Sequence, residues 1–191
     1  AHEAADQLRQ VSVNRPTHVF VQAGVGSLAG AVVGYFTNLY PNDPPKFVVM
    51  EARAADCLYQ GALAGDGKPR IVTGDLQTIM AGLACGEPNT ISWDILRNHV
   101  SAFISCPDWV SAKGMRMLSS PVKGDPRVVS GESGAVGMGV LDAIMCDDTY
   151  KELRDALELD RHSRVLMFST EGNTDPEKYR RVVWDGEYPT V

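Results

Sequence analysis

The residues best suited to chemistry are Gly24 to Ser27, GVGS, which have the composition of a phosphate-binding turn. They follow an apolar run, Val19 to Val21, and precede small and apolar residues from Leu28 to Tyr35. Two glycines two positions apart allow a tight turn whose amide N–H groups stay free. A helix that opens at such a turn adds the positive end of its dipole. This stretch therefore predicts a buried strand, a turn and a helix that together hold an anion.

Other interpretations of the same turn stay open. The pattern Gly24-x-Gly26-x-x-Ala29 also fits the dinucleotide-binding fingerprint. Glu51, which ends the next predicted strand, lies 25 residues after Gly26, near the spacing at which an acid holds the ribose hydroxyls. An NAD(P)-binding oxidoreductase domain is therefore one alternative. A plain strand–helix junction, with glycines for close packing, is another.

Two further stretches, Ser130 to Ala135 (SGESGA) and Ser169 to Asp175 (STEGNTD), combine glycine, hydroxyl and acidic residues. Each follows a predicted strand. Taken singly, each also suits a helix cap or a loop with special backbone angles. Because ligands of parallel sheets bind beyond the carboxyl ends of the strands, the three turns together predict one polar rim.

Strands and helices alternate along the chain, and this alternation must position the turns. The predicted strands are Val19–Val21, Lys46–Met50, Ile71–Gly74, Ala102–Ser105, Arg127–Val129 and Arg164–Phe168. The predicted helices are Ala1–Gln10, Leu28–Tyr35, Ala54–Ala64, Thr78–Cys85, Ser92–Asn98 with Ser92 as its cap, Asp108–Met117 with Asp108 as its cap, Glu132–Met145, Asp147–Leu159 and Pro176–Trp184. The pattern predicts an α/β fold with an open, mainly parallel, twisted sheet and helices on both faces.

Composition bounds the class of protein. The chain has 191 residues, 44% of them hydrophobic, and a formal net charge of −6, which suits one large domain or one and a half small ones. The acidic balance argues against nucleic acid or an anionic membrane as partner. No apolar run approaches the roughly 20 residues needed to span a bilayer. The amino-terminal residues AHEAADQL lack the apolar segment of a signal peptide and resemble a helix already under way.

The four cysteines, Cys57, Cys85, Cys106 and Cys146, are widely spaced and form no C-x-x-C pair. This pattern does not favour structural zinc and predicts reduced core thiols in a cytoplasmic protein.

Several motifs carry a resemblance to a known family. AGVGS, EARAADC, SGESGAVG and FSTEGNTD, in this order, resemble the fold type II pyridoxal-phosphate (PLP) enzymes, the group of tryptophan synthase β, threonine deaminase and serine racemase. At a finer level, QAGVGSLAGAV, DLQTIMAGLACGEPN, KGMRML, SGESGAVG and FSTEGNTDP are similar to the diaminopropionate ammonia-lyase family. The resemblance extends from the first predicted strand to Trp184.

The resemblance implies that the cofactor is PLP and that the substrate is a small amino acid, 2,3-diaminopropionate. The implied reaction is α,β-elimination to pyruvate and ammonia, and the implied assembly is a homodimer. It assigns the cofactor phosphate to Ala23, Gly24, Val25, Gly26 and Ser27, the pyridine nitrogen to Ser169 with Thr170 as its neighbour, and the vicinity of the ring to Glu132. Ala23 and Val25 depart from the glycine-richer loop that is usual in the family.

One departure concerns a metal. Glu51 and Ala55 match two ligands of the divalent cation site in serine-racemase-like members, but Cys57 stands in place of the second carboxylate. A thiol is a poor ligand for a hard cation such as magnesium. We therefore predict no metal site.

A second departure concerns the lysine that forms the Schiff base with PLP in this family. None of the six lysines, Lys46, Lys68, Lys113, Lys123, Lys151 and Lys178, has the family's serine-x-lysine context. The resemblance therefore implies that residues 1–191 are the carboxyl-terminal PLP-binding domain of a longer enzyme, that the catalytic lysine lies elsewhere, and that this chain alone is inactive. A non-catalytic module is the remaining alternative.

Overall fold

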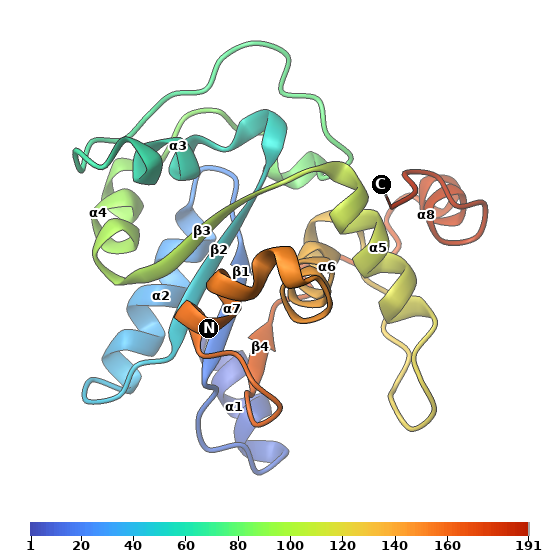
Figure 1. Cartoon of the computed structure of the whole chain (residues 1–191), viewed down its shortest axis with the longest axis horizontal. Coiled ribbons are helices and arrows are strands. Elements are labelled where there is room, and N and C mark those ends of the chain that lie inside the picture. The colour runs from blue at the N-terminus through green and yellow to red at the C-terminus, as the bar shows by residue number, and fades with distance from the viewer. Residues whose placement is uncertain (191) are drawn as a thin grey trace.

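In the computed structural model, which describes residues 1–190, four strands form one sheet in the order β3-β2-β1-β4 (Figure 1). The strands are β1 (His18–Gln22), β2 (Lys46–Ala52), β3 (Val100–Cys106) and β4 (Val165–Met167). All neighbouring strands are parallel. The predicted open, parallel α/β architecture is confirmed.

The sheet is buried on both faces because β1 and β2 carry apolar side chains at successive positions. Val19 and Val21 face one core cluster, and Phe20 between them faces the other. Val48 and Val49 of β2 divide in the same way. Since side chains alternate across a strand, a continuous apolar run produces a strand covered on both sides.

Helices cover both faces, as predicted (Figure 1). One cluster receives α1 (His2–Gln10), α2 (Ser27–Leu39), α3 (Cys57–Ala64) and α4 (Thr90–His99). The other receives α5 (Asp108–Ser119), α6 (Glu132–Cys146), α7 (Lys151–Leu157) and α8 (Pro176–Val183). Three short 3₁₀ helices, η1 (Arg53–Ala55), η2 (Ala81–Leu83) and η3 (Asp148–Tyr150), lie in the connections.

Glycines set the distance between α5 and α6. A Cβ atom on Gly114 would overlap the carbonyl oxygen of Ala135, and one on Gly139 would overlap the carbonyl oxygen of Val110. The two helices therefore touch backbone to backbone. Part of the glycine content around the SGESGAVG motif thus serves packing rather than ligand binding.

Two predicted strands do not form. In residues 71–74 the Val72 N–H donates to the Gly86 carbonyl at 2.8 Å, and in residues 127–129 the Val128 N–H donates to the Leu118 carbonyl at 2.9 Å. In both runs a backbone N–H group is therefore hydrogen-bonded to a neighbouring loop or helix end and not to another strand. Short β-branched runs have too weak a preference to form a strand without a ladder partner.

The helix predicted over 78–85 is reduced to η2. The Asp108 carboxylate accepts the Thr78 hydroxyl and, at 3.2 Å, the Ile79 N–H, and the Thr78 hydroxyl accepts the Met80 N–H at 3.1 Å. These side-chain bonds hold the backbone in a non-helical turn, because they compete with the bonds of a helix.

Other helix ends also differ from the prediction; for example, α2 extends to Leu39 and α3 begins at Cys57. Asn89, not Ser92, caps α4, and its side chain accepts the Ser92 N–H at 2.9 Å. Pro107 is the cap residue of α5, and Asp108 is its first helical residue. The helix predicted over 147–159 divides into η3 and α7 and ends where Glu158 takes a φ of +55°.

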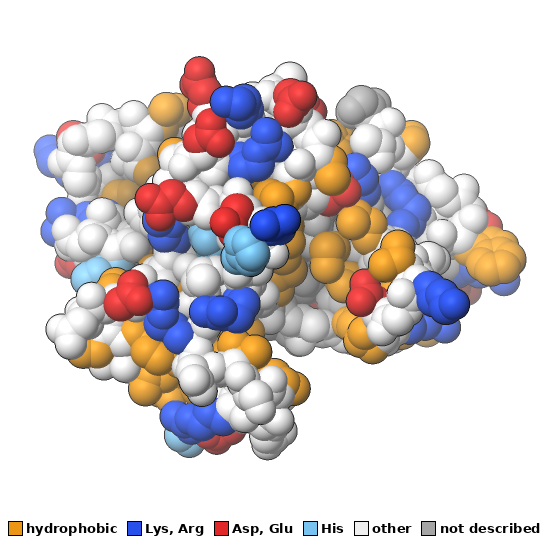
Figure 2. Space-filling model, turned by 60° about the horizontal axis from the view of Figure 1, so that its bottom comes forward, with side chains coloured by type: hydrophobic (Ala, Val, Ile, Leu, Met, Phe, Trp, Pro, Cys, Tyr) orange, Lys and Arg blue, Asp and Glu red, His pale blue; other side chains and the backbone are white. Residues whose placement is uncertain are grey.

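On the face shown in Figure 2, charged side chains of both signs lie over much of the surface, and apolar side chains gather in a hollow right of centre. Among the described residues, every helix is too short or too polar to cross a bilayer.

Candidate functional site

The glycine turn opens into a cavity of about 260 Å³ at the carboxyl end of β1. Residues 22–28 line one side, Gly82, Leu83 and Cys85 line another, and Ser133, Thr170 and Glu171 complete the wall. The cavity thus joins the turn after β1 to the start of α6 and the turn after β4. The three polar turns predicted to share a rim do meet, although among the described residues no strand lies directly before Ser130 to Ala135.

The turn itself presents free donors. Among the described residues, the N–H groups of Gly24, Val25 and Gly26 donate to no acceptor. Gly26 is the residue before α2 and has a φ of +92°, which favours glycine. Ser27 is the first, exposed residue of α2. Three unpaired amides and a helix N-terminus at one place have the chemistry that suits an anion.

Close packing behind the turn fixes its shape. A Cβ atom on Gly26 would lie 3.2 Å from side-chain atoms of both Leu58 and Leu96, and one on Gly24 would lie 3.4 Å from the Gly82 carbonyl oxygen. The turn is therefore supported by α3, α4 and the loop that contains η2.

Gln22 connects the two strand ends that form the rim. Its side-chain amide donates to the Phe168 carbonyl and to the Thr170 hydroxyl, both at 2.9 Å. The glycine turn and the turn after β4 therefore lie together at the edge of the sheet where the carboxyl ends of β1 and β4 meet. Thr170 reaches the cavity wall, whereas the Ser169 hydroxyl donates to the Ser130 hydroxyl at 2.9 Å and lies outside the residues that line the cavity.

Glu171 is a site residue that sequence reasoning missed. Its carbonyl accepts the Gly131 N–H at 3.0 Å, and its carboxylate accepts the Ser133 N–H at 2.6 Å. Glu171 thus caps α6 from a different segment of the chain. The acid in STEGNTD was visible in the sequence, but its partner was not.

Ser133 is the second residue that was missed. Its hydroxyl is buried, lines the cavity and has no hydrogen-bond partner among the described residues. A Cβ atom on Gly82 would lie 3.1 Å from this hydroxyl, so glycine at position 82 leaves room beside it. Buried polar groups in proteins are nearly always paired, and an unpaired one in a cavity wall marks a place for a ligand atom.

Glu132 points elsewhere. It lies outside the cavity wall, and its carboxylate is 3.4 Å from the Lys178 ammonium, which also donates to the Ile79 carbonyl at 3.1 Å. Glu132 thus joins α6 to α8 and to the loop before η2. Among the described residues, no lysine lines the cavity.

Glu51 does not reach the surface, which corrects its assignment as a ribose-binding acid. It is fully buried, and its carboxylate accepts the N–H groups of Leu58 at 2.9 Å and Tyr59 at 2.7 Å. Burial raises the pKa of Glu51 to about 8. The side chain therefore caps α3 inside the protein.

The cysteines are free thiols, with Cys57 and Cys106 buried and Cys85 partly buried. Cys146 is exposed, so its prediction as a core thiol is wrong. Burial, with Glu51 at 3.7 Å, raises the pKa of Cys57 to about 12. In the described part of the chain, no group of three or more His, Cys, Asp or Glu side chains is placed to hold a metal ion.

The chemistry of this cavity suits a ligand that carries a phosphate group. The free amides and the start of α2 suit a phosphate, and the hydroxyls of Ser133 and Thr170 suit polar atoms on a ring or substrate. The fold and this site are typical of α/β enzymes that bind a phosphorylated cofactor at the carboxyl ends of their strands. The chain belongs to the pyridoxal-phosphate dependent enzyme family, whose model matches residues 1–171.

Comparison with individual proteins shows that the chain is similar in sequence and structure to particular members of this family. Over 187 residues the chain is 50% identical to the diaminopropionate ammonia-lyase of Salmonella typhimurium, covering 97% of this chain and 46% of that protein. The chain of a crystal structure of Escherichia coli diaminopropionate ammonia-lyase in complex with D-serine is 45% identical, with a TM-score of 0.89 over 100% of this chain and 46% of that chain. The chain thus spans about half the length of the relatives it matches. Maize serine racemase, at 22% identity and a TM-score of 0.70 over 95% of this chain and 51% of that chain, shares the fold.

Proposed function

We propose that this chain is the carboxyl-terminal, PLP-binding part of a diaminopropionate ammonia-lyase. The reaction is α,β-elimination from 2,3-diaminopropionate, which gives pyruvate and ammonia. The observation that carries the proposal is one cavity whose wall includes both the turn with three unpaired amides and the buried, unpartnered hydroxyl of Ser133. Identity of 50% to a diaminopropionate ammonia-lyase supports the choice within the family.

The cofactor phosphate is held by the amides of Gly24 to Ser27, with the Ser27 hydroxyl as a further donor, and Ala23 begins this turn directly after β1. When bound, PLP withdraws electrons from the α-carbon of the substrate. Thr170, rather than Ser169, offers the neutral hydroxyl for the pyridine nitrogen, because Thr170 lies in the cavity wall. Ser169 supports that turn from behind through Ser130.

Ser133 supplies a hydroxyl to the cofactor or the substrate, while Glu132 acts through Lys178 to hold α6 against α8. In this proposal Glu132, which the resemblance assigns to the vicinity of the ring, is a positioning residue. Glu171 keeps the start of α6 in place through the Ser133 N–H.

The Schiff-base lysine belongs to a part of the enzyme outside these residues, because the chain covers only 46% of the Salmonella typhimurium relative and no lysine among the described residues lines the cavity. The complete enzyme acts as a cytoplasmic homodimer on a small amino acid and has no need of nucleic acid or membrane. Residues 1–191 constitute its cofactor-binding α/β domain.

A chimera tests the proposal. The amino-terminal part of the Salmonella typhimurium relative is joined to this chain, and pyruvate release from 2,3-diaminopropionate is measured with lactate dehydrogenase. We expect the chimera to release pyruvate and the chain alone to release none. A folded chimera that binds PLP and leaves diaminopropionate unchanged would contradict the proposed activity.

Binding of the cofactor phosphate is tested separately with 4′-deoxypyridoxine phosphate, which forms no Schiff base. Gly26→Ala should weaken its binding by about tenfold or more, because alanine disfavours the φ of +92° and its Cβ meets Leu58 and Leu96. Gly65→Ala is the matched control, since Gly65 also has positive φ, at +67°, but lies in open space away from the cavity. Equal affinity in both variants would exclude the turn as the phosphate site.

A further inference from the structure

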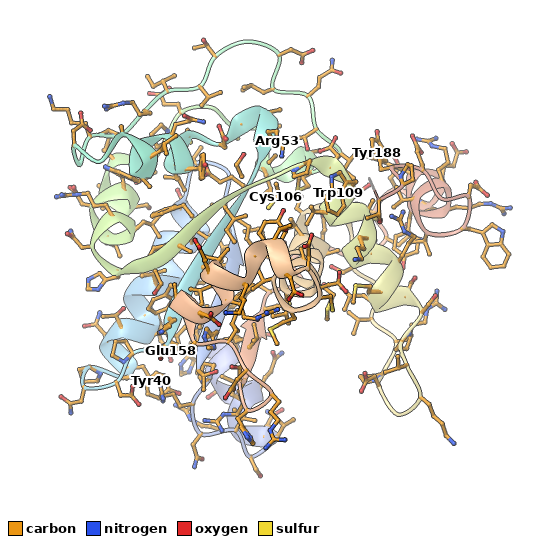
Figure 3. All side chains as sticks on the ribbon, viewed as in Figure 1. Tyr40, Arg53, Cys106, Trp109, Glu158 and Tyr188 are labelled. Atoms are coloured by element: carbon orange, nitrogen blue, oxygen red, sulfur yellow. The ribbon has the colours of Figure 1, made fainter. Side chains whose placement is uncertain are left out.

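A second cavity, of about 160 Å³, lies beyond the carboxyl end of β3 and shares no lining residue with the glycine-turn cavity. Its apolar wall comes from four elements, with Ile104 on β3, Trp109 on α5, Ile144 on α6 and Leu153 on α7. Arg53, the first residue of η1 after β2, also lines it. Figure 3 labels Arg53, Cys106 and Trp109, which lie around the end of β3. We call this space the Arg53 cavity.

The charge of Arg53 is available to a ligand. The residue is exposed, and among the described residues its guanidinium makes no hydrogen bond and no ion pair. The acids next to it in the sequence are occupied elsewhere. Asp56 accepts the Ser105 hydroxyl at 2.6 Å and the Gln60 amide at 3.2 Å, and Glu51 is buried under α3.

The size of the space indicates what fills it. A cavity of about 150 Å³ lined by aliphatic and aromatic side chains holds one benzene molecule, so about 160 Å³ admits a single six-membered ring. Trp109 gives the wall an aromatic face, and aromatic groups prefer edge-to-face or offset packing on such a surface. A guanidinium at the edge of the same space recognises carboxylate or phosphate through paired N–H donors.

We propose that the Arg53 cavity binds a small molecule with one apolar ring and one anionic group, an aryl carboxylate in the simplest case. The ring packs against Trp109 and Ile144, and the anion contacts Arg53. The site is separate from the cofactor cavity, so the proposal does not depend on the proposed lyase activity.

Calorimetric titration of the purified protein with phenylacetate tests the proposal. We expect saturable binding that is at least about tenfold tighter than binding of phenylacetamide, which keeps the ring but lacks the charge, or of acetate, which lacks the ring. Phenyl phosphate separates the two possible head groups. Tighter binding of phenyl phosphate than of phenylacetate, lost in the same variants, would support the site and identify phosphate as its anion.

The variant Arg53→Gln should weaken phenylacetate binding by about tenfold and leave phenylacetamide binding unchanged. Arg127→Gln is the matched control, because Arg127 lines a different surface hollow and also forms no ion pair with the described residues. Ala143→Phe fills the cavity from α6 and should remove binding of both ligands. Arg53 is exposed, so its variant stays informative even if Ala143→Phe fails to fold.

Two results would overturn the proposal. The first is the absence of saturable binding for all three aryl ligands. The second is equal affinity for phenylacetate in the Arg53→Gln and Arg127→Gln variants, which would place the anion elsewhere.

Discussion

The carboxylate of Glu171 accepts the backbone N–H of Ser133 at 2.6 Å, although the two residues are 38 positions apart in the chain. The bond joins the turn after β4 to the first turn of α6. Since both residues line the glycine-turn cavity, one hydrogen bond holds together two of its walls.

Replacing Glu171 by Gln should therefore weaken two properties together. The amide is a poorer acceptor and carries no charge toward the helix dipole, so we expect a loss of about 1 kcal/mol in the free energy of unfolding. Binding of 4′-deoxypyridoxine phosphate should weaken at the same time. Urea unfolding and a binding titration measure the two effects, with the exposed Glu152→Gln as control. A loss of stability without a loss of affinity would show that the cap does not shape the cavity.

Ser133→Ala should separate binding from folding. The hydroxyl has no partner among the described residues, so its removal should leave the free energy of unfolding unchanged or slightly raise it. Affinity for a ligand that bonds this hydroxyl should fall by about 1 kcal/mol.

Ser111→Ala is the matched comparison for this change. The Ser111 hydroxyl is also buried but donates to the Glu132 carbonyl at 2.5 Å. Its removal should cost stability, by about 1 kcal/mol, because a buried hydrogen bond is lost. The reverse order of the two stabilities in thermal unfolding would show that Ser133 has a structural partner.

The buried carboxyl of Glu51 should make stability depend on pH. Its pKa is about 8 in the folded chain against 4.5 for the unperturbed group. The folded state therefore holds a proton that the unfolded state has lost, and stability is fully present below pH 4.5 and declines as pH rises through about 8. The total change is on the order of a few kcal/mol.

Urea unfolding across this pH range measures the dependence. In Glu51→Gln the decline should flatten, because glutamine does not titrate. An unchanged slope in this variant would assign the pH dependence to other groups.

Gly139→Ala should destabilise the protein although alanine favours helices. Its Cβ would overlap the Val110 carbonyl oxygen, so α5 and α6 must separate, at a cost of about 1–3 kcal/mol. Gly34→Ala in α2 should change stability in the opposite direction, because there is room for the added Cβ. The nearest atom to its Cβ would be Ile95 Cδ1 at 4.0 Å, and the change should stabilise by up to about 1 kcal/mol. Thermal unfolding that gives both variants the same sign would contradict the packing argument.

The sequence was sufficient to predict the sheet where the apolar runs were continuous, as in Val19 to Val21 and Phe47 to Met50, because a strand covered on both faces needs apolar residues at every position. It failed at residues 71–74 and 127–129, where a strand depends on an available ladder partner. It also failed at residues 78–85, because the Asp108 carboxylate that prevents the helix lies 29 positions from Ile79.

The candidate site was also predictable only in part from the sequence. Turn composition was enough to predict that Gly24 and Ser169 share one side of the sheet. The role of individual side chains was not, because successive helical residues point about 100° apart. Glu132 therefore faces Lys178 while Ser133 faces the cavity. Only the packing of α6 against its neighbours decides which of the two reaches a ligand.

The pairing of β1 with β4 also governs the order in which the chain can assemble. His18 lies opposite Val165 in the sheet, so most of the polypeptide must be synthesised before β1 acquires its second neighbour. Contacts of such sequence separation form slowly because a long loop must close first. During synthesis, β1 can pair with β2 early, while Thr170 and Glu171 reach the glycine turn late. Binding of a phosphorylated ligand should therefore report the last stage of folding, and a chain that stops before β4 should expose one edge of the buried strand β1 to aggregation.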